Sequence, residues 1–146
     1  MLHEKNEKCL SERLAPGSKL DLNGLKEMEY RETDAWGVNI LRGFSLKGRR
    51  LSELTNPIAE KPAKSINLSD EQFARLCETV KSVNVGNWKA DYQPEGYAVS
   101  DGMLWDFKMV FEGNKVFASS GSNAWPDGFE EFYASITSML EEGAES

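Results

Sequence analysis

The sequence predicts an α+β fold, in which an antiparallel sheet of about 5–6 strands, built from two hairpins, packs two main helices on one face. Three observations support this prediction. Apolar residues recur at every second position in parts of 25–54 and 101–122, as in strands with one buried face. They recur at spacings of three and four in 69–84 and 127–141, as in amphipathic helices. Strands, helix, strands and helix therefore follow one another along the chain.

The length of 146 residues suits one domain. We expect residues 25–143 to form a single α+β domain. Residues 1–24, which contain Pro16-Gly17-Ser18, are expected to form an N-terminal appendage. Its apolar residues suit a short helix that packs on the domain or on a second copy, and its composition equally suits a loosely held tail.

The first half of the domain is expected to contain three short strands, at 25–31, 38–46 and 49–54. In the first strand, Glu27, Glu29 and Arg31 occupy alternate positions, which predicts an edge strand with one face in water. Gly48 permits the sharp turn of a hairpin between the second and third strands. Prolines in 56–64 indicate a connecting loop.

The clearest helix is expected at about 69–84. Ser69 is a natural N-cap and Gln72, three residues later, completes a capping box. Asn84 and Gly86 are expected to end the helix, after which Trp88 would lead a short strand. A ten-residue loop at 93–102 follows, and loops of this length often carry binding function.

The second half of the domain contains the strongest hairpin signal. Large apolar residues alternate with other residues from Trp105 to Phe111, and Gly113-Asn114 fits a two-residue type II′ turn. Counting back from that turn pairs Phe111 with Val116 and Met109 with Ala118.

The last helix is expected at about 127–141. Asp127 would cap it, with Glu130 at the third helical position, and Gly143 would end it. Its apolar residues form one stripe along the helix.

The net charge of −7 is concentrated in the C-terminal half, because residues 65–146 carry fourteen acidic and five basic side chains, a balance of −9. This half would repel a phosphate backbone, so direct binding to nucleic acid is not expected. No apolar run of 18 residues and no signal peptide is visible, so the expected location is cytoplasmic, without membrane insertion. Cys9 and Cys77 are expected to be reduced thiols.

The candidates for catalysis are few. The single histidine, His3, lies in the appendage, away from any expected site. The serines around Gly121 could form an anion-binding corner before the last helix, but its acidic first turn opposes an anion, and satisfaction of backbone groups explains them better. Four carboxylates could meet at one end of the sheet, and a solvated acidic rim is the favoured interpretation: Asp91, Glu95, Asp101 and Asp106. No metal or cofactor motif occurs in the sequence.

Exposed aromatic side chains would mark a contact surface. Trp36 and Tyr97 are the aromatic residues expected to be partly exposed, one beside Gly37 and the other in the long loop. Together with neighbouring polar groups they give six candidate residues for ligand or partner binding: Trp36, Tyr92, Tyr97, Asp101, Asn123 and Trp125.

Three motifs carry a resemblance to a known group of proteins: W-x-A-D-Y at Trp88–Tyr92, D-G-x-x-W at Asp101–Trp105, and S-G-S-N-A-W-P before F-x-x-F at 120–132. Together they resemble a recurrent, uncharacterised family of small bacterial α+β domains with a similar S-G-S-N-A-aromatic-P corner before the last helix. The resemblance covers about residues 65–142. It implies the α+β layout and a binding role, and no activity comes with it.

The leading hypothesis is a non-enzymatic binding domain, whose acidic and aromatic surface contacts a protein partner or another copy of the chain. One specific form is an acidic inhibitor of a nucleic-acid-binding protein. The rival hypothesis is an enzyme that uses carboxylates at the 93–106 end, on a glycoside-type substrate or with a metal.

Overall fold

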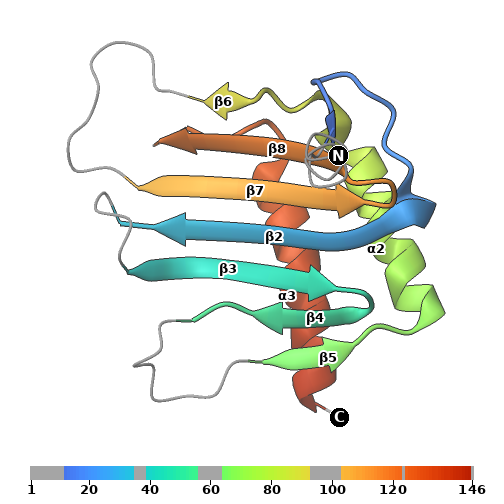
Figure 1. Ribbon diagram of the computed structural model, residues 1–146. Coiled ribbons are helices and arrows are strands. Elements are labelled where there is room, and N and C mark those ends of the chain that lie inside the picture. The colour runs from blue at the N-terminus through green and yellow to red at the C-terminus, as the bar shows by residue number, and fades with distance from the viewer. Residues whose placement is uncertain (1–11, 35–38, 56–63, 93–102, 123, 146) are drawn as a thin grey trace, which may run out of the picture.

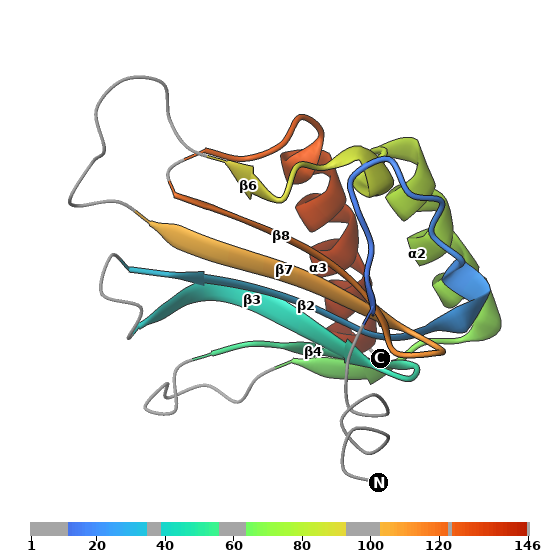
Figure 2. The ribbon, with the colours of Figure 1, turned by 45° about the horizontal axis from the view of Figure 1, so that its top comes forward.

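The computed structural model describes residues 12–34, 39–55, 64–92, 103–122 and 124–145. An open, mostly antiparallel sheet carries both helices on the same face (Figures 1 and 2). This arrangement confirms the α+β fold with two helices on one face of a sheet. The elements in chain order are β1 (Glu12–Arg13), η1 (Leu22–Gly24), β2 (Leu25–Thr33), β3 (Ile40–Lys47), β4 (Arg50–Glu53), β5 (Ser65–Asn67), α2 (Asp70–Ser82), η2 (Val85–Asn87), β6 (Asp91–Tyr92), β7 (Leu104–Phe111), β8 (Lys115–Ser122) and α3 (Phe129–Glu145).

The sheet has eight strands, where the sequence predicted five or six. Its order is β1-β8-β7-β2-β3-β4-β5, and β6 also pairs with β8. The strands that the sequence did not predict are short: β1 has two residues and β5 has three. β6, with two residues, is the end of the strand expected after Trp88, and 85–87 form η2 in place of its first part. Strands of this length contain no complete alternation, so periodicity does not detect them. β1 and β6 both run parallel to β8 and divide its outer edge between them.

β2 is a central strand, and the prediction of an edge strand was wrong. It pairs with β3 on one side and with β7 on the other. Its wet face has a different cause, because both helices cover only one face of the sheet (Figure 2). Glu27, Glu29 and Arg31 lie on the opposite face, called the open face below, which the described part of the chain leaves uncovered. Charged residues at alternate positions of a strand are therefore compatible with an uncovered face of the sheet, and not only with an uncovered edge.

The β7–β8 hairpin is confirmed, but its register differs from the prediction by one residue. Phe111 pairs with Lys115 and Met109 pairs with Phe117. Three residues separate the two strands, and both Gly113 and Asn114 have positive φ angles, of 81° and 58°. A two-residue type II′ turn is therefore wrong. The extra loop residue moves Phe117 to the helical face, where it is fully buried.

The capping box of α2 is confirmed. The Gln72 backbone N–H donates to Ser69 Oγ at 3.1 Å, and the Ser69 N–H donates to Gln72 Oε1 at 2.8 Å. The helix ends at Ser82, and Asn84 then takes a left-handed conformation with φ of 61°.

The bounds of α3 differ from the prediction at both ends. The helix begins at Phe129 and not at Asp127, because Gly128 directly before it has a φ of 82°, outside the helical range. It continues through Gly143 to Glu145. Glycine lowers helix propensity by only about 1 kcal/mol, which a helix packed along a sheet can tolerate.

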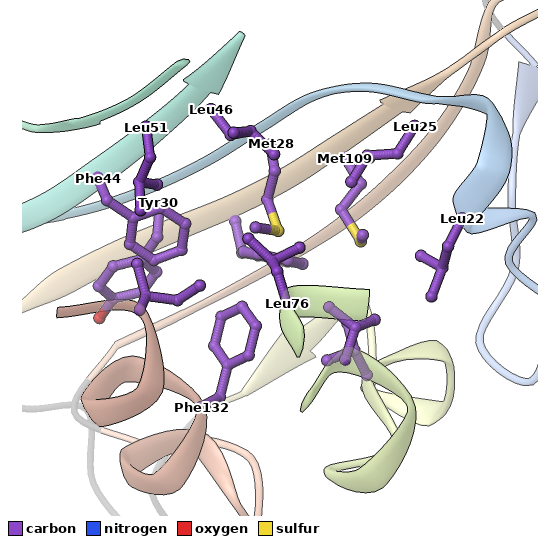
Figure 3. Packing of buried hydrophobic residues seen from close by; sticks show 14 of the residues in the cluster. Leu22, Leu25, Met28, Tyr30, Phe44, Leu46, Leu51, Leu76, Met109 and Phe132 are labelled. Carbon is purple, nitrogen blue, oxygen red and sulfur yellow. The ribbon is translucent and has the colours of Figure 1, made fainter. Parts of the chain in front are cut away.

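The core lies between the sheet and the two helices (Figure 3). Tyr30 and Phe44 of the sheet are fully buried, and so are Leu76 of α2 and Phe132 of α3. Trp88 is 3% exposed, and its indole N–H has no hydrogen-bond partner among the described residues. The ring of Phe107 and that of Phe132 both stand edge-on to the indole.

Residues 12–24 belong to the same sheet and core. The Leu14 N–H donates to the Val116 carbonyl at 2.7 Å, and the Gly17 N–H donates to the Gly86 carbonyl at 2.7 Å. Leu22 is buried in the core cluster. The first part of the chain that the structure describes is therefore an integral edge of the domain.

Candidate functional site

Two of the six candidate residues lie in the described part of the chain, Tyr92 and Trp125; the other four, Trp36, Tyr97, Asp101 and Asn123, lie outside it. Tyr92 is half-buried in β6, and its ring centroid lies 5.9 Å from that of Trp105. Its hydroxyl accepts the Lys89 N–H at 2.9 Å. Tyr92 therefore fixes β6 against the sheet.

Trp125 leads into a buried polar cluster that the sequence analysis did not identify. Its indole N–H donates to the Tyr30 hydroxyl at 3.0 Å, and that hydroxyl donates to Glu32 Oε2 at 2.5 Å. Tyr30 is fully buried and Glu32 is 4% exposed. Arg42 Nε donates to the same Glu32 oxygen at 2.8 Å. A carboxylate is thus held on the core side of the sheet by two donors from two neighbouring strands.

Arg42 connects this cluster to α3. Its Nη2 donates to Glu130 Oε1 at 3.1 Å. Its guanidinium carbon lies 4.4 Å from the ring centroid of Tyr133 and 5.4 Å from that of Phe129. The cation therefore stacks on two aromatic rings while it neutralises Glu32.

The electrostatics of the cluster are those of a satisfied network. Burial raises the pKa of Tyr30 well above its ordinary value of 10.0, and the hydrogen bond to Glu32 raises it further. Burial also raises the pKa of Tyr133. Both phenols therefore stay protonated at neutral pH. The cluster holds its charges in place and joins β2, β3 and α3. Its residues line none of five surface cavities found among the described residues.

The serines near Gly121 lie within β8 and do not form a corner before the helix. Ser119 Oγ donates to the Lys89 carbonyl at 2.6 Å, so it satisfies a backbone group. Gly121 is required by close packing, because a Cβ atom there would lie 2.6 Å from Trp105 Nε1. Its φ angle is not positive, so close packing, and not a left-handed backbone conformation, accounts for this glycine.

Four carboxylates were expected to form a solvated acidic rim or, in the rival hypothesis, a catalytic site, and of these Asp91 and Asp106 are described. Both pair in register with Ser120 of β8, one from each side. They therefore lie on the open face two strands apart, at roughly 10 Å. Both are exposed, and Asp106 stands opposite Arg31 of β2. None of the five cavities is lined by either carboxylate.

One end of the sheet is apolar. Among the described residues, three large hydrophobic side chains are exposed: Leu41 by 50%, Leu104 by 38% and Met103 by 36%. All three lie at the same end of the sheet. Leu104 pairs with Thr33, and Thr33 pairs with Ile40, beside which Leu41 is the additional residue of a β-bulge. We call these three residues the apolar corner.

The open face beside β2 carries charges that are balanced in sign. Across β2, Arg31 stands opposite Asp106, Glu29 opposite Lys108, and Glu27 opposite Lys47. Arg31 Nη2 also lies 3.7 Å from Glu29 Oε2. A contact surface centred on the apolar corner would therefore have a polar rim of both signs on its β2 side.

The acidic excess of the C-terminal half is partly neutralised by basic residues that precede it. Lys64 pairs with Glu141, and Arg42 pairs with Glu130. Within the same half, Arg75 pairs with Glu142, with the nitrogen and oxygen 3.0 Å apart. Three of the acidic side chains of α3 are thus engaged with cations on neighbouring elements.

The described residues contain no group of three or more histidine, cysteine, aspartate or glutamate side chains placed to hold a metal ion. None of the helices in the described ranges is both long and apolar enough to cross a membrane. Comparison of the chain with protein-family models, curated proteins and solved structures finds no match.

Proposed function

We propose that the chain is a non-catalytic binding domain that contacts a protein partner through the apolar corner and the adjoining open face. One observation carries the proposal: the three exposed large hydrophobic side chains of the described residues are collected at one end of the sheet. Isolated exposed apolar residues are ordinary on a protein surface, whereas a group rimmed by polar residues is typical of a contact site.

The bulge at Leu41 supports this assignment. A β-bulge inserts one residue and redirects its side chain, and such bulges are frequent beside functional sites. Here the bulge directs a leucine into solvent with half of its surface exposed. Burial of Leu41 and Leu104 by a partner would remove apolar surface from water, which contributes about 25 cal/mol per Å².

Site-specific photo-crosslinking tests this proposal. We would place a photoreactive phenylalanine derivative at Leu41, at Leu104 and, as a control, at Ser138, which is exposed on α3. A partner that uses the apolar corner crosslinks from the first two positions and not from the third. A second copy of the chain would give a crosslinked dimer in the same experiment.

The identified partner is then purified and its affinity measured. Leu41→Asp combined with Leu104→Asp is expected to weaken binding at least about tenfold, because charged groups would be buried in an apolar contact. Ser138→Asp is the matched control and is expected to leave the affinity unchanged. Crosslinking that is equally strong from Ser138, or equal affinities of the two variants, would refute the proposal.

A further inference from the structure

A groove between residues 17–23, called the strap, and α2 is a second surface that the proposed function does not use. The strap is held at both ends. The Gly17 N–H donates to the Gly86 carbonyl at 2.7 Å, and the carbonyl of Gly24, directly after the strap, accepts the Glu112 N–H at 2.8 Å. Figure 2 shows this blue segment passing beside the green helix α2 before it enters β2. The strap lies at the start of β2, whereas the apolar corner lies at its end.

Two cavities lie along this groove, with volumes of about 360 and 470 Å³. They share four lining residues, so together they form one continuous surface depression: Lys19, Leu20, Leu22 and Lys81. Cavities of 300–1,000 Å³ are typical of sites for small molecules.

The walls of the groove are packed backbone segments. Gly86 closes one end, since a Cβ atom there would lie 3.0 Å from the Ser18 carbonyl oxygen. Asn84, with its left-handed conformation, turns the chain at the end of α2 and places η2 beside the strap. The space is therefore bounded by three backbone segments that are fixed relative to one another.

The chemistry of the lining is amphiphilic. Leu20, Leu22 and Val80 supply apolar surface, and the exposed Lys19 and Lys81 supply two positive charges. Asp21 is the acidic residue of the lining, and its carboxylate accepts the Asn23 N–H at 3.2 Å. The groove thus has a positive balance on a chain whose net charge is −7.

We propose that this groove binds a small amphiphilic anion, a carboxylate with an apolar tail. The tail would lie against Leu20 and Val80, and the carboxylate would lie between the two lysine ammonium groups. The C-terminal carbonyls of α2 carry partial negative charge and oppose an anion there. Both lysines are therefore needed, and removal of the pair is expected to abolish the preference for a charged ligand.

Octanoate and octanol form a matched pair of probes, equal in tail length and different in charge. We would follow the backbone amide signals of Gly17, Gly86 and Leu20 by ¹H–¹⁵N correlation spectroscopy during titration to about 3 mM ligand, at which octanol is still dissolved. Octanoate is expected to give saturable shifts at these amides and to bind at least about fivefold more tightly than octanol. Absence of saturable shifts, or equal affinity for octanol, would overturn the proposal.

The variant Lys19→Gln/Lys81→Gln is expected to weaken octanoate binding about tenfold and to leave octanol binding unchanged. Lys108→Gln, on the open face, is the control with the same change of charge and is expected to bind octanoate as the native chain does. Because all three lysines are exposed, the variants are expected to fold normally. Equal loss of binding in the control would show a general effect of net charge and would overturn the assignment.

Cys77 gives an independent measurement, because it lines the second cavity and burial raises the pKa of its thiol. In a Cys9→Ser background, saturating octanoate is expected to slow alkylation of Cys77 severalfold, and octanol at the same concentration is expected to slow it less, in line with its weaker binding. An unchanged alkylation rate in saturating octanoate would refute occupation of the groove beside α2.

Discussion

Replacement of Arg42 by methionine tests whether the buried carboxylate of Glu32 depends on its cation. The side chain of Glu32 is 5% exposed and that of Arg42 is 31% exposed, with Nε and Oε2 2.8 Å apart. Removal of one partner from a buried ion pair typically costs about 3–5 kcal/mol. Tyr30 still donates to the carboxylate and Arg42 is partly solvated, so we expect the lower end, about 3 kcal/mol, for Arg42→Met.

The measurement is urea denaturation followed by tryptophan fluorescence. Arg31→Met is the matched control, because Arg31 is a neighbouring arginine whose side chain is 47% exposed and whose nearest carboxylate oxygen is 3.7 Å away. An exposed pair of this kind contributes at most about 1 kcal/mol. The difference between the two variants gives the combined cost of losing the buried pair with Glu32 and the contacts of Arg42 with α3.

The double variant Glu32→Leu/Arg42→Met separates charge pairing from loss of packing. Replacement of a buried pair by apolar residues of similar size is often neutral, so the double variant is expected to be more stable than Arg42→Met alone. The argument would be refuted if the separate losses of stability in Glu32→Leu and Arg42→Met added up to the loss in the double variant. It would also be refuted if Arg42→Met and Arg31→Met cost the same.

The remaining predictions concern pH, capping and packing. Because burial raises the pKa of Tyr30 and Tyr133 above their ordinary value of 10.0, the free energy of unfolding is expected to fall as pH rises above about 10, by up to about 1.4 kcal/mol per pH unit for each phenol. Tyr30→Phe should reduce this slope in urea denaturation at about pH 9 to 11.5, and an unchanged slope would contradict the prediction. Ser69→Ala removes the N-cap of α2 and is expected to cost about 1 kcal/mol, seen as a fall in Tm of about 3 °C, whereas a Tm within 1 °C of the native value would argue against the cap's contribution. Gly121→Ala places a Cβ atom 2.6 Å from Trp105 Nε1 and is expected to destabilise the fold by about 2–3 kcal/mol in the same denaturation assay, and a neutral result would show that the indole can move aside.

Elements with strong local signals were predictable from sequence. The capping box at Ser69 and Gln72 located the start of α2, because both halves of that signal lie within four consecutive residues. The hairpin was also located correctly, but its register depended on the loop length. Two positive φ angles, at Gly113 and Asn114, belong to a loop one residue longer than the predicted turn, and this one residue moved Phe117 to the opposite face.

Elements that depend on distant partners were not predictable. A two-residue strand such as β1 exists because β8 offers it an edge, and no local pattern encodes that edge. The position of β2 within the sheet also depends on distant strands and has no local pattern in the sequence. The alternating charged residues of β2 predicted that one side of the strand is exposed to water. Only the positions of the helices show that this side is a face of the sheet and not its edge.

The polar cluster did leave a signal in the sequence. Met28, Tyr30 and Glu32 occupy alternate positions of one strand, and so do Arg42 and Phe44 of the next. Continuation of each alternation places an acid and a base on the buried face, where opposite charges are expected to pair. The apolar corner left a weaker signal in the sequence, because the exposure of Leu41 follows from a bulge that alternation does not predict.

The division of the β8 edge between β1 and β6 has a consequence for the order in which the protein assembles on the ribosome. Glu12 pairs with Lys115, so β1 is synthesised 103 positions before the strand that receives it. At about 5–20 residues per second, the segment waits roughly 5–20 s for its partner. β6 waits for a much shorter time, because Asp91 pairs with Ser120. Closure of the sheet beside β1 is therefore expected among the late events of synthesis, and until then β1 has no strand with which to pair.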